Sequence, residues 1–171
     1  MILCCGRILA PLLGLLALCL GSTALADPVS ALSPPGNAIG LHSSYLKETG
    51  ASLTIAEADE AYHSGKFLAG DTSVLNFGIG SRPVWIHFDV ENRTGASLLR
   101  RLSIETAWLD RVDIYFRAGR KVVAAYHLGD AQDFAQRPID SRFFEVDHDF
   151  DPGASDVFIR VETSDPMVVP V

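Results

Sequence analysis

The chain has 171 residues, a formal net charge of −7 and 20% charged side chains. An acidic chain without basic clusters is not typical of proteins that bind nucleic acid or anionic membrane surfaces. All three cysteines, Cys4, Cys5 and Cys19, lie near the N-terminus, so the remainder is expected to fold without a disulfide bond.

Residues 1–26 are predicted to be a secretory signal peptide. Arg7 supplies a short positive region, an apolar run extends from Ile8 to Leu20, and Ala24-Leu25-Ala26 has the small residues that signal peptidase accepts. The apolar run is shorter than the ~20 residues of a membrane-spanning helix. We therefore expect an exported protein with one domain after the signal.

The segment 27–40 is interpreted as a linker because it contains Ser33-Pro34-Pro35-Gly36. A short helix is expected soon after it. Thr54 and Glu57 have the spacing of a capping box, in which each side chain binds the other residue's backbone N–H. Alanines follow, and Gly65 is the expected end of a helix of about two turns.

Most of the remaining chain has the period of β-strands. From Val84 to Glu91, apolar residues alternate with Trp85, His87, Asp89 and Glu91, which indicates a strand with one buried and one wetter face. The alternation resumes at 102–104 and 112–116. Three consecutive half-buried strands predict an antiparallel sheet.

Further strands are expected at 122–126, 143–146 and 157–161. The turn Ala118-Gly119-Arg120 would make the first of these the second arm of a hairpin, and an acidic turn at 147–156 would separate the other two. Seven or eight short strands with regular turn signals predict an all-β fold, an antiparallel β-sandwich with one short helix.

An ordered set of short segments resembles one known family. In chain order they are Leu53-Thr54-Ile55-Ala56-Glu57-Ala58, Leu75-Asn76-Phe77-Gly78, Val84-Trp85-Ile86, Val90-Glu91-Asn92, Leu109-Asp110-Arg111-Val112-Asp113-Ile114-Tyr115, Leu128-Gly129-Asp130, Phe134-Ala135-Gln136-Arg137 and Phe158-Ile159-Arg160-Val161. Together they make residues 41–171 similar to the type 2 extracellular domain of bacterial seven-transmembrane receptors with diverse intracellular signalling modules (7TMR-DISM).

The resemblance implies a jelly-roll sandwich on the periplasmic side of the membrane. It implies a non-catalytic input module, without a cofactor, that senses a small polar ligand such as a carbohydrate. Complete relatives continue into seven membrane helices and a cytoplasmic output domain, so a seven-transmembrane module is expected downstream or as a partner. His87 stands where many relatives carry an arginine, which weakens the case for an anion contact there.

A candidate ligand-binding face lies opposite the core side of the strands. It carries His87, Asp113, Tyr115, Arg160 and Glu162, and its aromatic and charged groups suit a sugar, because rings stack on sugar faces while charged groups bind hydroxyls. The alternative is a half-exposed face stabilised by cross-strand ion pairs.

Arg137 is a further candidate, in the loop after Phe134; it could reach a ligand or pair with Asp133 or Asp140. Trp85 and Trp108 are expected to pack rather than bind, because large aromatic residues mostly contribute buried area.

No metal site and no catalytic site are predicted. The alternating carboxylates of 147–151 resemble a Ca²⁺ loop, but Pro152 and Phe158 stand where such a loop needs Gly and Glu. The five histidines show no ligand-like spacing, and no Gly-x-Ser-x-Gly motif is present. Two alternatives remain open, a stand-alone secreted carbohydrate-binding protein and a glycan-modifying enzyme that uses two carboxylates.

Overall fold

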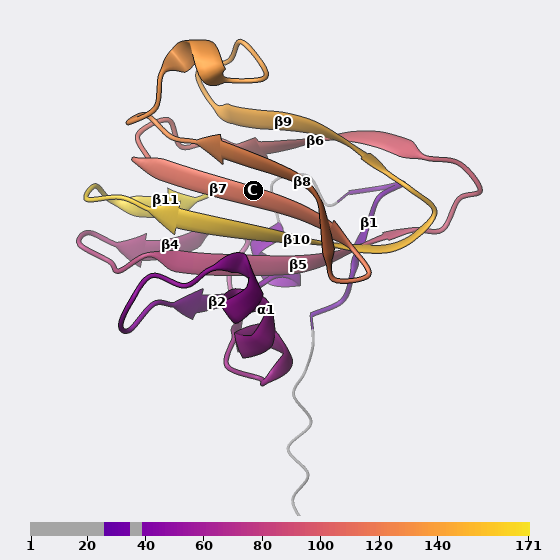
Figure 1. Ribbon diagram of the computed structural model, residues 1–171, viewed down its shortest axis with the longest axis horizontal. Helices are drawn as coiled ribbons and strands as arrows, with labels where there is room; N and C mark the ends of the chain where they lie inside the picture. The colour runs from indigo at the N-terminus through magenta and orange to yellow at the C-terminus, as the bar shows by residue number, and fades with distance from the viewer. Residues whose placement is uncertain (1–25, 35–38) are drawn as a thin grey trace, which may run out of the picture.

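The computed structural model describes residues 26–34 and 39–171, which form a two-layered β-sandwich (Figure 1). One layer is a seven-stranded sheet in the order β3-β2-β5-β10-β7-β8, with β1 also paired to β5; the two-stranded sheets β11-β4 and β6-β9 form the other layer. The strands are β1 (Val29–Ser30), β2 (Ser44–Lys47), β3 (Leu68–Ala69), β4 (Leu75–Gly78), β5 (Val84–Asn92), β6 (Leu98–Ile104), β7 (Arg111–Ala118), β8 (Lys121–Leu128), β9 (Phe144–Phe150), β10 (Gly153–Glu162) and β11 (Met167–Val169).

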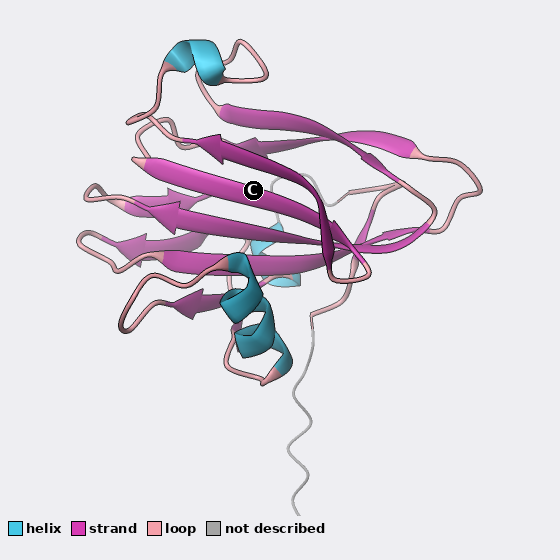
Figure 2. Cartoon of the chain, in the orientation of Figure 1, coloured by secondary structure: helices cyan, strands magenta, loops and turns pink. Residues whose placement is uncertain are grey.

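The helical elements are α1 (Ile55–His63) and the 3₁₀ turns η1 (Ile39–His42) and η2 (Phe134–Gln136), shown in cyan in Figure 2. The predicted fold class, a β-sandwich with one short helix near the N-terminus, is confirmed. The predicted signal peptide lies, except for Ala26, outside the described residues. Within the described part, no helix is long and apolar enough to cross a membrane.

The chain order of the strands is not their order in the sheets. β10 lies between β5 and β7 and pairs antiparallel with both, whereas β6 pairs with β9 in the other layer. The expectation that three consecutive strands share one sheet is therefore wrong. Leu102 and Ile104 of β6 are buried in the same core as β5, but they reach it from the opposite side.

The predicted hairpin is confirmed, because β7 pairs antiparallel with β8 across a turn in which Gly119 and Arg120 have positive φ. The predicted acidic turn at 147–156 is wrong. Residues 147–150 belong to β9 and Asp156 lies within β10. The buried side chain of Phe150 continues the alternation of β9, so the acidic residues between its apolar positions lie on a strand rather than in a loop.

Residues from both layers fill one hydrophobic core. Val84, Ile86, Phe88 and Val90 of β5 face it, as their alternation predicts, together with apolar residues of β10, β7, β9 and β11. The expectation that the opposite face of β5 is wet is wrong at its centre, where Trp85 and His87 are each only 1% exposed. Helix α1 covers this part of the sheet.

Helix α1 begins at the predicted capping box. The Thr54 backbone N–H donates to the Glu57 carboxylate (2.8 Å), and the Glu57 N–H donates to Thr54 Oγ1 (3.3 Å). Gly65 follows the C-terminal cap with φ +70°, a left-handed conformation that glycine adopts without strain, so the predicted end of the helix is confirmed. Ala58 packs against Trp85 and Phe158 of the sheet.

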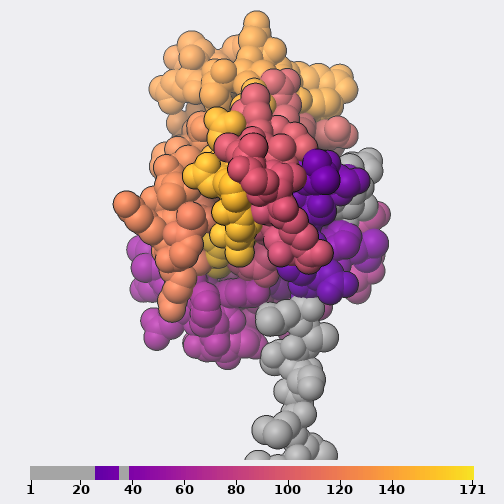
Figure 3. Space-filling model, turned by 90° about the vertical axis from the view of Figure 1, so that its right-hand side faces the viewer, coloured from indigo at the N-terminus to yellow at the C-terminus, as the bar shows by residue number. Residues whose placement is uncertain are grey.

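The segment interpreted as a linker contributes to the fold. β1 pairs parallel with β5 at Val90 and Glu91, while β2 pairs antiparallel with residues 84–87 of the same strand. One edge of β5 therefore changes partner at Phe88 and Asp89. The indigo N-terminal segment lies against the rest of the sandwich in Figure 3, and its Val29 is buried in the core.

The capping box predicts the effect of a small substitution. Thr54→Ala removes the acceptor for the Glu57 N–H and should lower the free energy of unfolding by ~1 kcal/mol, measured by urea denaturation. Thr54→Ser keeps the hydroxyl and should stay close to the wild type. Equal stability of all three proteins would contradict a stabilising role for this cap.

Candidate functional site

A cleft of about 440 Å³ opens beside the C-terminal end of α1, where the helix meets β2, β3 and β5. Its rings come from His42, Tyr62, His63, Phe67 and His87. Its wall thus combines apolar rings with hydrogen-bonding groups, which is the composition of a small-molecule site.

Two polar groups of the cleft lie on neighbouring strands. Asp89 of β5 lines it, and so does Ser44 of β2, which stands opposite His87 in the register. Ser44 Oγ is buried and has no hydrogen-bond partner among the described residues. A buried hydroxyl without a partner is costly, so this position favours a ligand or an ordered water.

The rings are packed so that His87 has a fixed orientation. Its imidazole lies against the Tyr62 ring, with centroids 3.8 Å apart and an interplanar angle of 36°, and against Phe158 at 4.5 Å. Phe67 meets Tyr62 edge to face at 5.5 Å. Helix α1 and strand β10 thus hold the imidazole between rings on two sides.

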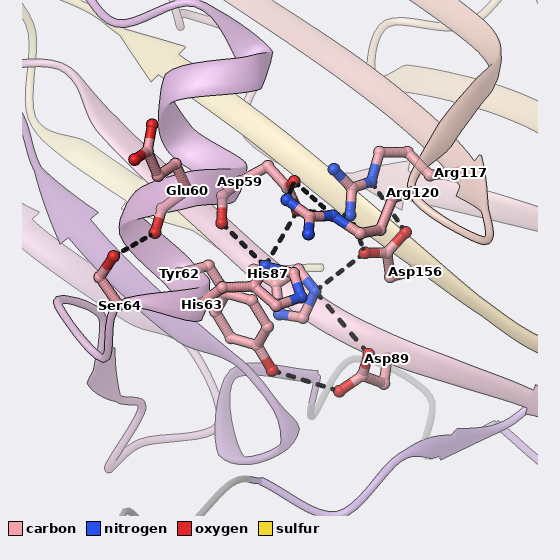
Figure 4. A network of polar contacts seen from close by, with 10 residues as sticks. All are labelled: Asp59, Glu60, Tyr62, His63, Ser64, His87, Asp89, Arg117, Arg120 and Asp156. Atoms are coloured by element: carbon pink, nitrogen blue, oxygen red, sulfur yellow. Dashed lines mark hydrogen bonds and ion pairs between the residues drawn. The ribbon is translucent and has the colours of Figure 1, made fainter.

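His87 approaches two carboxylates with the same ring nitrogen (Figure 4). Its Nε2 lies 3.4 Å from Asp156 Oδ2 and 3.8 Å from Asp89 Oδ1. The Tyr62 hydroxyl donates to Asp89 Oδ2 at 3.5 Å. Burial and the nearby Asp89 charge raise the pKa of Tyr62 to about 12, so this phenol stays a protonated donor at neutral pH.

Arg117 links helix and sheet beneath the cleft. Its guanidinium is 2% exposed and donates from Nε to Asp156 Oδ1 (3.0 Å) and from Nη2 to Asp156 Oδ2 (2.6 Å); the same Nη2 lies 2.8 Å from Asp59 Oδ1 of α1. Arg120 also donates to Asp59. We call these four residues, Asp59, Arg117, Arg120 and Asp156, the Arg117 network.

The network keeps its carboxylates ionised. Burial would raise the pKa of Asp156, but hydrogen bonds from His87 and Arg117 outweigh it, and the pKa lies below its usual value. The pKa of Asp59 is lowered in the same way, because Arg117 and Arg120 outweigh its burial.

Four of the predicted site residues form a separate group on β7 and β10. Arg160 stands opposite Asp113, and Tyr115 lies on the same face, half-buried and stacked on Trp85 with centroids 5.9 Å apart. His87, the fifth predicted residue of this face, belongs instead to the cleft.

The charges of this separate group are paired within the protein. Arg160 donates to Glu48 through Nε (2.9 Å) and Nη2 (3.1 Å), and through Nη1 to Glu162 (2.8 Å). Asp113 is buried between Arg111 Nε (2.9 Å) and His127 Nδ1 (2.6 Å). These ion pairs are those expected if the face stabilises the sheet, which is the alternative to ligand binding given by the sequence.

Arg137 is apart from both groups. Its Nη1 donates to the carbonyl oxygens of Ser141 (2.8 Å) and Arg142 (3.1 Å), and its guanidinium lies over the rings of Phe134 and Phe144. It pairs with neither of the expected aspartates among the described residues.

The two tryptophans differ. Trp85 is buried as expected, but Trp108 is 46% exposed, so the expectation that it mainly contributes buried area is wrong for this residue. The Trp108 Nε1–H donates to the Pro166 carbonyl oxygen at 3.0 Å, which holds the ring at the surface.

Sequence reasoning missed most of the cleft. The sequence predicts only that Tyr62 and His63 lie in a helix and that Asp89 lies on the wetter face of a strand. One signal was present: Asp59 and Tyr62 are three positions apart, so they share one face of a two-turn helix with Ala58. A helix face with these two polar side chains is expected to lie over polar residues, and in the structure Asp59 contacts Arg117 and Tyr62 contacts Asp89.

Comparison with known proteins decides the family. The model of the family described as 7TMR-DISM extracellular 2 matches residues 40–171. The chain belongs to this family. The resemblance expected for residues 41–171 is thus confirmed, and a 7TMR-DISM extracellular domain is a receptor sensor domain outside the cytoplasm. A search of curated proteins found no match.

The Glu48–Arg160 pair of this 7TMR-DISM domain predicts its acid sensitivity. Burial would raise the pKa of Glu48, but hydrogen bonds from Arg160, the Leu53 N–H and Trp85 outweigh it and lower the pKa. A carboxylate whose pKa is lower in the folded state stabilises the fold above its unfolded-state pKa, about 4.3, and loses this effect as pH falls through the folded-state value.

We expect the free energy of unfolding to fall as the pH drops below about 4.3. Glu48→Gln should lower stability at pH 7 by ~3 kcal/mol and make the pH dependence shallower, measured by urea denaturation at several pH values. Glu60→Gln, at an exposed position of α1, is the control and should keep the wild-type profile. The same slope for Glu48→Gln and the wild type would contradict the role of the pair.

Proposed function

We propose that this protein is the periplasmic ligand-sensing input domain of a bacterial seven-transmembrane receptor, and that its ligand is a small polar molecule, with carbohydrates as the first class to test. The observation that carries the proposal is the ring-lined cleft between α1 and β5 in a domain of this family. A volume of about 440 Å³ is suited to one or two sugar rings rather than to a polymer end with many subsites.

The chemistry of the cleft supports a sugar-like ligand. Phe67 and Tyr62 offer ring faces, on which the C–H groups of a pyranose pack. Asp89 accepts hydrogen bonds, and the imidazoles of His42 and His63 offer ring nitrogens at the mouth. Hydroxyl-rich ligands need both kinds of contact, and the unpartnered Ser44 Oγ adds a further polar group.

The same geometry supports binding without catalysis. A glycosidase needs one carboxyl group whose pKa is raised, so that it stays protonated and acts as an acid. Here Asp59, which is buried, and Asp156, whose side chain is 15% exposed, are held ionised by Arg117, and their pKa values are lowered. These two groups are therefore suited to structure and to charge recognition, not to proton donation.

Two locations for a bound saccharide can be told apart by mutation: the cleft, and the face of β7 and β10 that carries Tyr115, which we call the Tyr115 face. Titrations of glucose, galactose and N-acetylglucosamine into the purified protein, followed by calorimetry, should show saturable binding of at least one sugar. His63→Ala, at the cleft, should weaken that binding about tenfold, or ~1.4 kcal/mol. His127→Ala is the matched control, an exposed histidine beside Tyr115, and should leave the affinity unchanged.

The reverse pattern, in which His127→Ala weakens binding and His63→Ala does not, would place the ligand on the Tyr115 face. If none of the three sugars binds the wild type, the carbohydrate part of the proposal is wrong. Circular dichroism of both variants checks that the fold is intact.

We further propose that the domain acts together with a seven-transmembrane module, in the same polypeptide or as a partner. An antibody against this domain should detect it in the membrane fraction of the native cells after lysis. Detection only in the soluble periplasmic fraction would contradict the receptor role and leave a free binding protein as the explanation.

A further inference from the structure

Three potential metal ligands meet at the inner wall of the cleft. They are His87 Nε2, Asp89 Oδ1 or Oδ2, and a carboxylate oxygen of Asp156, and the ligand atoms all lie within 4.8 Å of one another (Figure 4). We propose that His87, Asp89 and Asp156 form a binding site for a divalent transition-metal ion, with Zn²⁺ the best fit. This inference goes beyond the proposed function and does not depend on it.

The distances from His87 to the two carboxylates are close to those between ligands of one metal ion. His87 Nε2 lies 3.4 Å from Asp156 Oδ2 and 3.8 Å from Asp89 Oδ1. Charge-assisted hydrogen bonds are shorter, about 2.7–2.9 Å. Two ligand atoms at about 2.0–2.1 Å from a tetrahedral Zn²⁺ are separated by about 3.4 Å, close to the observed values.

The strand register makes a cation favourable at this place. Asp89 and Asp156 stand directly opposite each other on β5 and β10, an arrangement of like charges that destabilises a sheet. Asp59 adds a third carboxylate, against the two guanidinium groups of Arg117 and Arg120. The cluster therefore keeps one formal negative charge that a bound cation would offset.

Arg117 is compatible with metal binding by Asp156. Each carboxylate oxygen has two lone pairs, so Oδ2 can accept from Arg117 Nη2 and still hold a cation with the other pair. A group that orients a ligating carboxylate and keeps it ionised is the usual outer partner of a metal site.

The ligand set indicates Zn²⁺ rather than Ca²⁺. Ca²⁺ takes six to eight oxygen atoms, whereas Zn²⁺ is bound by imidazole nitrogen and by carboxylate oxygen and needs only four ligands. Three protein ligands leave a fourth tetrahedral position for water or for an oxygen of a ligand. Because His87 and Asp89 line the cleft, that position opens into it.

The spacing of histidines in the sequence could not reveal this site, because the site contains only one histidine, His87. Its ligands come from positions i and i+2 of β5 and from the facing residue of β10, which is 67 positions after Asp89 in the chain. Only the strand pairing brings them together.

The test is calorimetric titration of ZnCl₂ into the purified protein after chelator treatment, in the absence of any sugar. We expect one Zn²⁺ per chain. Asp89→Asn is the main variant, because the Asp89 side chain is 40% exposed and its loss should leave the fold intact. It should weaken Zn²⁺ binding about tenfold or more, and His87→Gln should do the same. Asp149→Asn, an exposed acidic position on β9, is the matched control and should bind as the wild type.

Two further measurements make the outcome specific. Zn²⁺ should raise the melting temperature of the wild type and have a smaller effect on Asp89→Asn, because a ligand that binds only the native state stabilises it. Co²⁺ in place of Zn²⁺ should give the intense visible absorption of a tetrahedral site. No binding to the wild type, or binding that is lost in His42→Ala or His63→Ala but kept in Asp89→Asn, would overturn the proposal. Either result would leave saccharide binding in the cleft untouched.

Discussion

The guanidinium of Arg117 is the constraint on which the rest of this structure depends. It is almost fully removed from solvent and contacts carboxylates of both α1 and β10 while lying over the Phe158 ring, 4.6 Å from its centroid. Without its charge, Asp59 and Asp156 would be buried carboxylates without enough cationic partners, at a cost of several kcal/mol. Helix α1 has nine residues, so it depends on tertiary contacts for its stability. It packs on the sheet through Ala58, and the contacts of Arg117 with Asp59 and Asp156 add a charged link between α1 and β10 next to the cleft.

Two groups of polar residues on the large sheet, one around Arg160 and Asp113 and the other around His87, differ in how their charges are paired. Around Glu48 and Arg160, and around Asp113, every charge finds its partner within the same face at ordinary hydrogen-bond distances. Around His87 the distances to the carboxylates are longer, and the buried hydroxyl of Ser44 has no hydrogen-bond partner among the described residues. The first arrangement stabilises the sheet. The second leaves hydrogen-bonding capacity for something that is not part of the protein, which is why the functional proposals concern the cleft.

The sequence predicted what depends on neighbours along the chain. The capping box of α1, the glycine that ends it and the hairpin at Gly119 each involve residues within a few positions, so local chemistry sets them. The alternation of β5 identified its core face correctly, but it could not show that α1 would cover the other one. Arg117 follows Asp59 by 58 positions and precedes Asp156 by 39, and no periodicity links them. The strand pattern and the family resemblance both indicated the fold, and the resemblance supplied the class of function. The alternation of the strands, however, led us to expect the ligand on a face where the structure pairs Arg160 with Glu48 and Asp113 with Arg111.

The change of partner along one edge of β5 has a mechanical consequence. Before Phe88 this edge is held by β2, and after Asp89 it is held by the short parallel strand β1, so no strand on this edge spans the two residues. On the opposite edge, β10 pairs with both. Ala26, three residues before β1, lies in the wall of the cleft. This edge of β5 is therefore held by two separate strand pairings, of which the N-terminal one consists of two residue pairs. Release of β1 would leave β2 as the remaining strand on this edge, next to two residues that line the cleft.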